Sequence, residues 1–316
     1  FGQAVILMLI QIGALGIMSV VALFSVFTGK RLGLMNRLTI QESLNNFTFE
    51  GIVKTFKSIL LVTLAIEAFG ALVLLIEFIP IYGFSTGIIK SIFHSVSSFC
   101  NAGFDIFGSE ANPFTSILTF NDKPLLILTT SLLVIVGGLG FIVWNDIAVN
   151  RKFSKLTLHS KVVLSTSGLL LLFGTFAFLI FEYNNPLTLS SMPVQDKLLN
   201  SFFQSVTSRT AGFSSIAPNQ MTELSNFFTI ILMFIGGAPG STAGGIKVTT
   251  FSILILTVIS LAKGGTDVQV FERRLPEEMI KKAIAVLLLA ILTVITVTLI
   301  LLYCNKISFM QAFYES

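Results

Sequence analysis

Long apolar runs are the feature that most restricts how this chain can fold. Helical runs of about 20 apolar residues cover the hydrocarbon core of a bilayer. Such runs lie at Ala4–Thr28, Ser58–Ile79, Leu125–Val149, Val162–Phe181, Phe227–Leu261 and Ala283–Tyr303. Only 11% of the residues are charged, against about 25% in a soluble domain. The runs therefore predict an all-α integral membrane protein.

Basic residues sort the connections between these runs. Lys and Arg number five in 29–57, four in 151–161 and five in 263–282, but only two each in 80–124 and 182–226. Cytoplasmic connections carry the excess of basic residues, so we expect 29–57, 151–161 and 263–282 to be cytoplasmic. This placement explains the net charge of +4 without a nucleic-acid partner. Lipid headgroups are natural partners of such a face.

Two shorter, semi-polar runs lie in the outer connections. Gly87–Phe99 and Lys197–Ser208 are each too short to span the membrane. Each predicts a half-helix that enters from the outside and returns. Irregular backbone at this depth survives only where it lines a cavity or is buried in protein.

The same two segments reveal an internal repeat. Ser91–Ser98 matches Ser201–Ser208 at five of eight positions, and Ala102–Phe104 matches Ala211–Phe213 after a gap of one residue. Ser308–Ser316 looks like the approach to another half-helix. The repeating unit is therefore a span, a re-entrant loop and a second span.

The repeat suggests four parts of the chain. We expect the second helix of a first unit with a cytoplasmic linker in 1–57, a second unit in 58–157, a third in 158–270 and the start of a fourth in 271–316. Because the chain starts inside an apolar run and stops inside a repeat, we expect an internal fragment with its ends missing. The first and fourth re-entrant segments would then lie outside it.

The residues after each half-helix form a candidate cation filter. Glycine permits the backbone angles that aim successive carbonyls to one side, and a ring of carbonyls replaces the hydration shell of a monovalent cation. The candidate filter residues are Cys100, Asn101, Ala102, Gly103, Phe104, Thr210, Ala211, Gly212 and Phe213.

A glycine-rich stretch interrupts the run Phe227–Leu261. It holds five Gly and one Pro within Gly236–Gly245, and forcing it into a helix would cost roughly 8 kcal/mol. A helix broken at membrane depth marks a pore or a binding site, whereas a packing kink needs only one or two such residues. The candidate gate residues are Gly236, Gly237, Ala238, Pro239, Gly240, Ser241, Thr242, Ala243, Gly244, Gly245 and Lys247.

Three of these segments resemble a known family. Ser98–Asp105, Thr207–Phe213 and Gly236–Lys247 are similar to the Trk/Ktr/HKT potassium transporter superfamily, most of all to the membrane subunit of bacterial Ktr systems. The resemblance implies potassium uptake through four non-identical filter segments arranged like a potassium channel, with K⁺ held by backbone carbonyls and a glycine-rich gate below them. It also implies a multi-pass protein of the bacterial cell membrane. Na⁺ is a second possible cargo.

The resemblance also implies partners. These are a second copy of the chain, forming a homodimer, and a cytoplasmic RCK-type nucleotide-binding ring that docks on the basic face. No cofactor is expected, and the sequence shows no acid–base pair, activated nucleophile or metal-ligand cluster that would indicate an enzyme. The alternative function is a sodium-coupled secondary transporter, although such proteins more often show inverted repeats.

Three charged residues have more than one interpretation. Glu67, near the centre of a span, either pairs with Arg209 to brace the filter or binds cations. Lys247 either repels a passing cation or anchors the gate. Asp105 either concentrates cations or is a solvated loop acid. Two further acids are interpreted as interfacial charges at span ends, Asp146 and Glu182.

Overall fold

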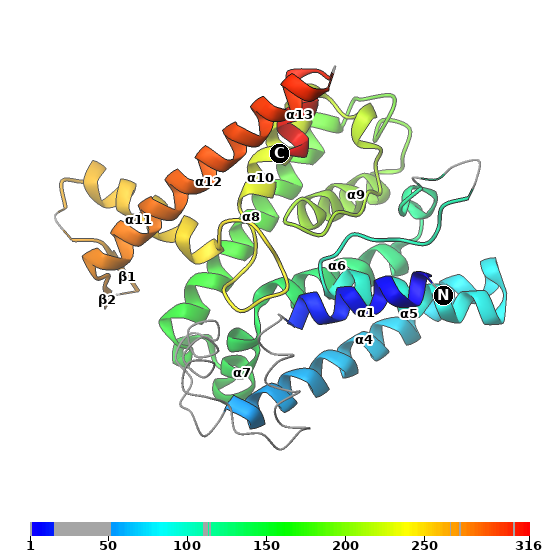
Figure 1. Cartoon of the computed structure of the whole chain (residues 1–316), viewed down its shortest axis with the longest axis horizontal. Coiled ribbons are helices and arrows are strands. Elements are labelled where there is room, and N and C mark those ends of the chain that lie inside the picture. Colours follow the sequence, from blue (N-terminus) through cyan, green and yellow to red (C-terminus); the bar gives the residue numbers. More distant parts are fainter. Residues whose placement is uncertain are drawn as a thin grey trace. The chain divides into compact units, whose positions relative to one another are not determined.

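Helices make up most of the part of the chain that the computed structural model describes (Figure 1), residues 2–15, 52–109, 113, 115–265, 267–271, 273–305 and 307–316. The α-helices are α1 Gly2–Leu15, α4 Ile52–Tyr82, α5 Phe84–Phe99, α6 Pro124–Leu139, α7 Phe141–Asn150, α8 Leu158–Glu182, α9 Val194–Thr207, α10 Glu223–Phe234, α11 Val248–Ala262, α12 Glu277–Cys304 and α13 Phe309–Glu315. The short 3₁₀ helices are Leu118–Phe120, Phe153–Lys155 and Pro218–Gln220. Two short strands, β1 Gln269–Val270 and β2 Arg273–Arg274, complete the described elements. The all-α prediction is confirmed.

Three of the predicted spans are long, apolar helices. Lys57–Tyr82, Leu158–Glu182 and Glu277–Cys304 are each long and apolar enough to cross a membrane. The predicted half-helices are also present, as α5 and α9. Residues 16–51, which hold the rest of the first predicted span and most of the basic linker, lie outside the described residues.

The predicted span Leu125–Val149 is not one helix, so this prediction is wrong in its continuity. The helix ends at Leu139 and a second one begins at Phe141, bent away from the first. Gly140 separates them with φ 85° and ψ 147°, a backbone conformation that glycine adopts far more readily than other residues. The apolar pattern alone did not reveal this break.

The predicted break in Phe227–Leu261 is present. Helix α10 ends at Phe234 and α11 begins only at Val248. The glycine-rich stretch between them is not helical. The density of helix-breaking residues accounts for this interruption.

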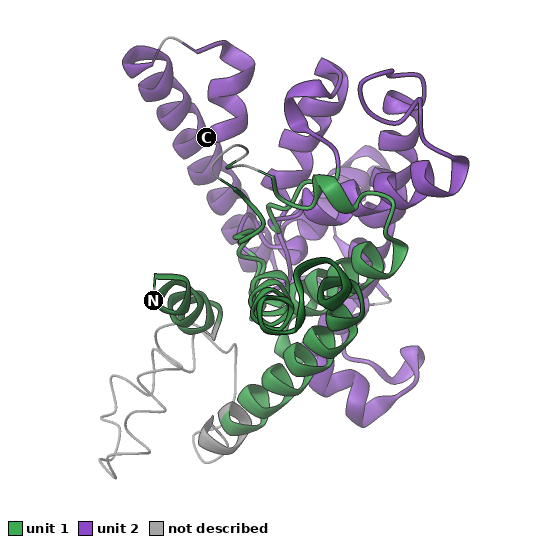
Figure 2. Cartoon of the chain, turned by 90° about the vertical axis from the view of Figure 1, so that its right-hand side faces the viewer, with its two compact units in different colours: residues 1–142, 211–215, 240–243 green, residues 143–210, 216–239, 244–316 purple. Residues whose placement is uncertain are grey.

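The chain divides into two compact units (Figure 2). The first unit holds residues 1–142 together with 211–215 and 240–243, and so contains α1, α4, α5 and α6. The second unit holds 143–210, 216–239 and 244–316, and so contains α8 to α13. Each unit has its own half-helix packed against a spanning helix, α5 on α4 and α9 on α8.

One packing detail is the same in both units, and we call it the serine–glycine contact. In the first unit the Ser95 hydroxyl donates to the Glu67 carbonyl (2.7 Å), and a Cβ on Gly70 would lie 2.6 Å from Ser95 Oγ. In the second, the Ser205 hydroxyl donates to the carbonyl of Leu171 (2.9 Å) and faces Gly174. Small residues let helices approach closely within membranes. In both pairs, therefore, any side chain at the glycine would collide with the serine.

Two acids in the second unit hold the starts of helices. Asp146 Oδ2 accepts from the Thr157 amide (2.9 Å) and hydroxyl (2.8 Å), where α8 begins. Glu182 Oε1 accepts from the amide and hydroxyl of Thr222 (both 2.8 Å), where α10 begins. Both acids are buried. They therefore satisfy backbone donors that a helix start leaves open, a role beyond that of interfacial charges.

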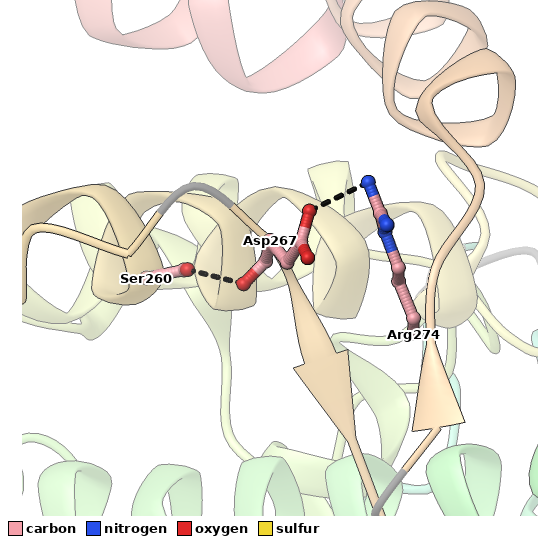
Figure 3. A network of polar contacts seen from close by, with 3 residues as sticks. All are labelled: Ser260, Asp267 and Arg274. Atoms are coloured by element: carbon pink, nitrogen blue, oxygen red, sulfur yellow. Dashed lines mark hydrogen bonds and ion pairs between the residues drawn. The ribbon is translucent and has the colours of Figure 1, made fainter.

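A short hairpin joins α11 to α12 (Figure 3). Strands β1 and β2 pair antiparallel, with Gln269 opposite Arg274. Arg274 forms an ion pair with Asp267 (2.7 Å), and the Ser260 hydroxyl donates to the Asp267 carbonyl (2.8 Å). Because the pair is exposed, it adds little stability by itself. The hairpin and its ion pair lie within 263–282, the third of the connections predicted to be cytoplasmic.

Candidate functional site

Left-handed backbone marks both candidate filter segments. Asn101 and Gly103 have φ of 51° and 72°, and Thr210 and Gly212 have φ of 75° and 84°. The left-handed residues are thus two apart in each segment, directly after the half-helices. This alternation turns successive peptide planes, as an ion-binding backbone requires. Such a φ is a genuine outlier for a β-branched residue such as Thr210.

The two segments meet at their glycines, within the first unit. A Cβ on Gly103 would lie 2.6 Å from the carbonyl oxygen of Ala211 and 3.0 Å from the Cα of Gly212. A Cβ on Gly212 would lie 3.3 Å from the Cα of Gly103. Two segments 109 positions apart in the sequence therefore come into close backbone contact.

Buried side chains support the first segment from behind. His94 Nε2 lies 3.0 Å from the hydroxyl of Thr130, and its ring packs edge-on against Phe213 with 4.8 Å between ring centroids. The Cys100 thiol lies 3.6 Å from Glu67 Oε1 as a weak donor. These contacts place the half-helix, the filter and the neighbouring helices in one packed cluster.

Glu67 is nearly fully buried, with 4% of its surface exposed. Its carboxylate accepts from the Cys100 thiol within the first unit. Arg209 belongs to the second unit, so the expected pairing with Glu67 stays a prediction. The cation-binding interpretation of Glu67 likewise stays open.

The loop after Gly103 is also bonded to its own unit. The Ser97 hydroxyl donates to the Phe104 carbonyl (2.6 Å) and the Lys90 ammonium donates to the carbonyl of Ile106 (2.6 Å). Asp105 Oδ1 accepts from the Phe107 amide (3.1 Å). Asp105 therefore shapes its own loop, which neither of its two sequence interpretations included.

The tip of the glycine-rich stretch, residues 240–243, contacts the base of the first filter segment. Thr242 Oγ1 donates to the carbonyl of Phe99 (3.0 Å), the last residue of α5, and accepts from Asn101 Nδ2 (2.8 Å). Its amide donates to the carbonyl of Gly137 (3.2 Å). All four residues lie in the first unit. The candidate gate and the candidate filter are therefore bonded directly.

The base of the same stretch is closed within the second unit. The amide of Gly236 donates to the carbonyl of Ile246 (2.9 Å), and the amide of Ile246 donates to the carbonyl of Phe234 (3.1 Å). A parallel bridge pairs Ile235 with Ile246. A Cβ on Gly236 would collide with the carbonyl oxygen of Gly244, so glycine is required by this close approach.

Lys247 directly precedes α11. Its side chain borders a cavity of about 1110 Å³ lined mostly by apolar residues of α10, α11, α12 and α13. A lysine beside such a cavity is compatible with both sequence interpretations, repulsion of a cation and anchoring of the loop.

Sequence reasoning singled out the filter glycines but missed the roles of Asn101 and Thr242 as bonding partners. Asn carried one usable signal, since it tolerates left-handed backbone better than most residues. Thr242 carried none, because a lone hydroxyl in a glycine-rich stretch does not indicate its acceptor. The contact joins residues 141 positions apart.

Repeated pairs of a long apolar helix and a half-helix, each followed by a left-handed segment, are the arrangement of a pore-loop membrane protein. The profile of the TrkH family, described as cation transport protein, matches residues 1–315. The chain therefore belongs to the TrkH cation transport family. It is a multi-pass membrane transport protein and not an enzyme.

Curated and solved relatives agree with this assignment. The Ktr system potassium uptake protein B of Bacillus subtilis is 38% identical over 316 residues, which cover all of this chain and 70% of that protein. The potassium/sodium uptake protein NtpJ of Enterococcus hirae is 43% identical over 283 residues, 90% of this chain and 61% of that protein. The crystal structure of the potassium transporter TrkH from Vibrio parahaemolyticus matches with a TM-score of 0.68 at 20% identity, over 88% of this chain and 57% of that one. The last match supports the fold, and the chain spans 57–70% of the length of these three proteins.

Proposed function

We propose that the protein takes up potassium ions through a filter built from backbone carbonyls and gated by the glycine-rich loop. The named functions of the two curated relatives support potassium as cargo, and one of them adds sodium. The observation that carries the gating part is the bond from Thr242 to the Phe99 carbonyl. It joins the tip of the proposed gate to the base of the proposed filter.

The position of that bond suggests how the closed state works. The C-terminal end of a helix carries partial negative charge, which favours a cation. Phe99 is the last residue of α5, and its carbonyl oxygen is engaged by the Thr242 hydroxyl. The gate tip is thus anchored at the negative end of the half-helix, where it shares the Phe99 carbonyl with Asn101 Nδ2 (3.3 Å).

Opening has a modest cost in this arrangement. The tip is held by hydrogen bonds from Thr242 to Phe99 and to Gly137, by the bond from Asn101 to the Thr242 hydroxyl, and by the bond from the Phe141 amide to the Gly240 carbonyl (3.0 Å). Each such bond contributes about 0.5–1.5 kcal/mol. The four together contribute roughly 2–6 kcal/mol, and the lower end of this range is within reach of a regulatory ligand, whose coupling is typically about 1–3 kcal/mol.

The gate is tested by removing its tip. Deleting 238–243 from the full-length protein is expected to raise Rb⁺ flux into proteoliposomes. Thr242→Val removes the hydroxyl that donates to the Phe99 carbonyl and accepts from Asn101, and the loss of these two bonds is expected to raise the flux about five- to 150-fold. The control is Thr257→Val, because the Thr257 hydroxyl bonds only the Ile253 carbonyl of its own helix (2.7 Å) among the contacts described. Unchanged flux in both folded tip variants would contradict the gate.

The same vesicles separate a channel from the alternative, a sodium-coupled secondary transporter. Flux through a channel follows the membrane potential, whereas a coupled transporter shows saturable exchange that depends on the second ion. We expect Rb⁺ uptake to follow an imposed potential without a sodium gradient. Uptake that requires the gradient would favour the alternative.

We further propose that the protein acts as one membrane subunit of a larger assembly. The word "system" in the name of the Bacillus subtilis relative supports this. The expected assembly is a homodimer with a cytoplasmic nucleotide-binding ring of RCK type. Co-purification of the full-length protein with such a ring, and its mass in detergent, test this proposal.

A further inference from the structure

Two side chains of α5 hold the loop that follows the first filter segment. We infer that Ser97 and Lys90 are positioning residues that set cation selectivity by fixing the backbone of Phe104–Ile106. This inference rests on the proposed potassium filter. It assigns roles to residues that carry no filter carbonyl of their own.

Ser97 makes the inner of the two contacts. Its side chain is completely buried, and its hydroxyl donates to the Phe104 carbonyl at 2.6 Å. Phe104 itself is exposed, so this bond to a buried donor is the contact that holds the peptide plane following Phe104. Phe104 is the last residue of the candidate filter segment.

Lys90 makes the outer contact. Its ammonium donates to the carbonyl of Ile106 at 2.6 Å and lies 4.3 Å from the centroid of the Tyr82 ring and 5.1 Å from that of Phe107. Tyr82 and Phe107 stack with 6.4 Å between centroids. Asp105 acts electrostatically on the same ammonium. The charge is therefore held in place by two rings, a carbonyl and a nearby acid.

The two accepting carbonyls have a common direction. Phe104 and Ile106 are two residues apart, and their donors, Ser97 and Lys90, both lie in α5. Both carbonyls are turned toward α5, so the intervening peptide is fixed as well. Selectivity among monovalent cations depends on the number and arrangement of filter carbonyls. A loosened outer loop would free Gly103, directly before it, to change its carbonyl direction.

The lysine of the second half-helix, Lys197, bonds a different stretch of backbone. Lys197 in α9 also lies over a tyrosine ring, 4.1 Å from the centroid of Tyr183. Its ammonium donates to the Tyr183 carbonyl (3.2 Å), at the end of α8. The two lysines therefore share the ring contact and differ in the backbone that they bond, which provides a matched control.

The test compares four variants of the full-length protein in proteoliposomes. Ser97→Ala and Lys90→Met remove one donor each, and the reversal potential under opposed K⁺ and Na⁺ gradients gives the permeability ratio. Losing a hydrogen bond of this kind is expected to lower the K⁺/Na⁺ ratio about three- to tenfold. Ser98→Ala and Lys197→Met are the controls. Ser98 donates to the carbonyl of His94 in its own helix (2.6 Å), and both controls are expected to keep the ratio within about twofold of wild type.

Rescue and failure are both defined. Ser97→Thr restores a hydroxyl and is expected to recover the ratio. Lys90 is only half-buried, so its variant keeps the test decisive if Ser97→Ala does not fold. An unchanged ratio in the folded Ser97 and Lys90 variants, or an equal loss in the controls, would overturn the inference. Gly103→Ser distinguishes failure of the proposed filter from failure of this inference. If Gly103→Ser also leaves selectivity unchanged, the proposed filter is wrong. If Gly103→Ser alone changes selectivity, only the positioning role of Ser97 and Lys90 is wrong.

Discussion

The two units carry the same helix pair but continue it differently. Each half-helix is tied to its span by a serine–glycine contact, Ser95 with Gly70 and Ser205 with Gly174. After the first filter segment, the next long helix is broken at one residue, Gly140. After the second, the interruption covers 235–247. The helix pair is therefore the repeated framework, and the two units differ in the helix on the C-terminal side of each filter segment.

The largest effect should come from disturbing that framework. Gly70→Leu and Gly174→Leu place a side chain where Ser95 or Ser205 already lies, and overpacking of this kind costs about 3 kcal/mol. We expect both variants to lose thermal stability in detergent, measured by the midpoint of loss of the folded size-exclusion peak.

Gly168→Leu is the control for this prediction. Gly168 also lies on α8, but a Cβ there would meet no atom within 4 Å. It should remain near wild-type stability. Equal loss in all three variants, or loss in only one of the two framework variants, would break the equivalence of the two units.

The next effect should distinguish the two filter segments. Serine at a left-handed position costs about 1–2 kcal/mol, which applies to both Gly103 and Gly212. Only at Gly103 would the new Cβ also come 2.6 Å from the Ala211 carbonyl oxygen. We therefore expect Gly103→Ser to lower the K⁺/Na⁺ ratio about tenfold and Gly212→Ser about threefold. The readout is potassium-limited growth and its inhibition by sodium, with the full-length protein. If both variants rescued growth and stayed selective, the filter assignment would fail.

The smallest effect concerns the two acids that hold helix starts. Asp146→Asn and Glu182→Gln keep the shape but weaken the acceptor for Thr157 or Thr222. Helix-start contacts typically contribute about 1 kcal/mol. We expect a loss of this size in each variant, seen as a few degrees in thermal midpoint, with selectivity unchanged. A changed K⁺/Na⁺ ratio would show that these acids serve the ion path directly.

Sequence pattern predicted the helices, both half-helices and the interruption of the gate helix, because each has a local cause. Apolar length defines a span, and glycine with proline breaks one. The two glycines of the candidate filter, Gly103 and Gly212, do have left-handed backbone, a conformation that favours glycine; their role in a filter stays a prediction. The break at Gly140 was missed because a single glycine inside an apolar run is more often tolerated than not.

The contacts of the site could not be predicted from the pattern. Ser97 and Ser98 are adjacent and chemically identical, yet one bonds the filter loop and the other its own helix. Only the direction of each residue around α5 distinguishes them. Thr242 likewise finds its acceptor through tertiary structure, across 143 positions. Local propensity contains no information about partners at that separation.

The serine–glycine contact has a consequence for how the protein is made. Its hydrogen bonds join residues only 28 positions apart in the first pair, Ser95 and Glu67, and 34 in the second, Ser205 and Leu171. Contacts between residues close in sequence form early, because little chain has to be ordered first. Each half-helix can thus find its groove on the span just synthesised, before later parts of the chain emerge. Biogenesis of the pore can then proceed one helix pair at a time.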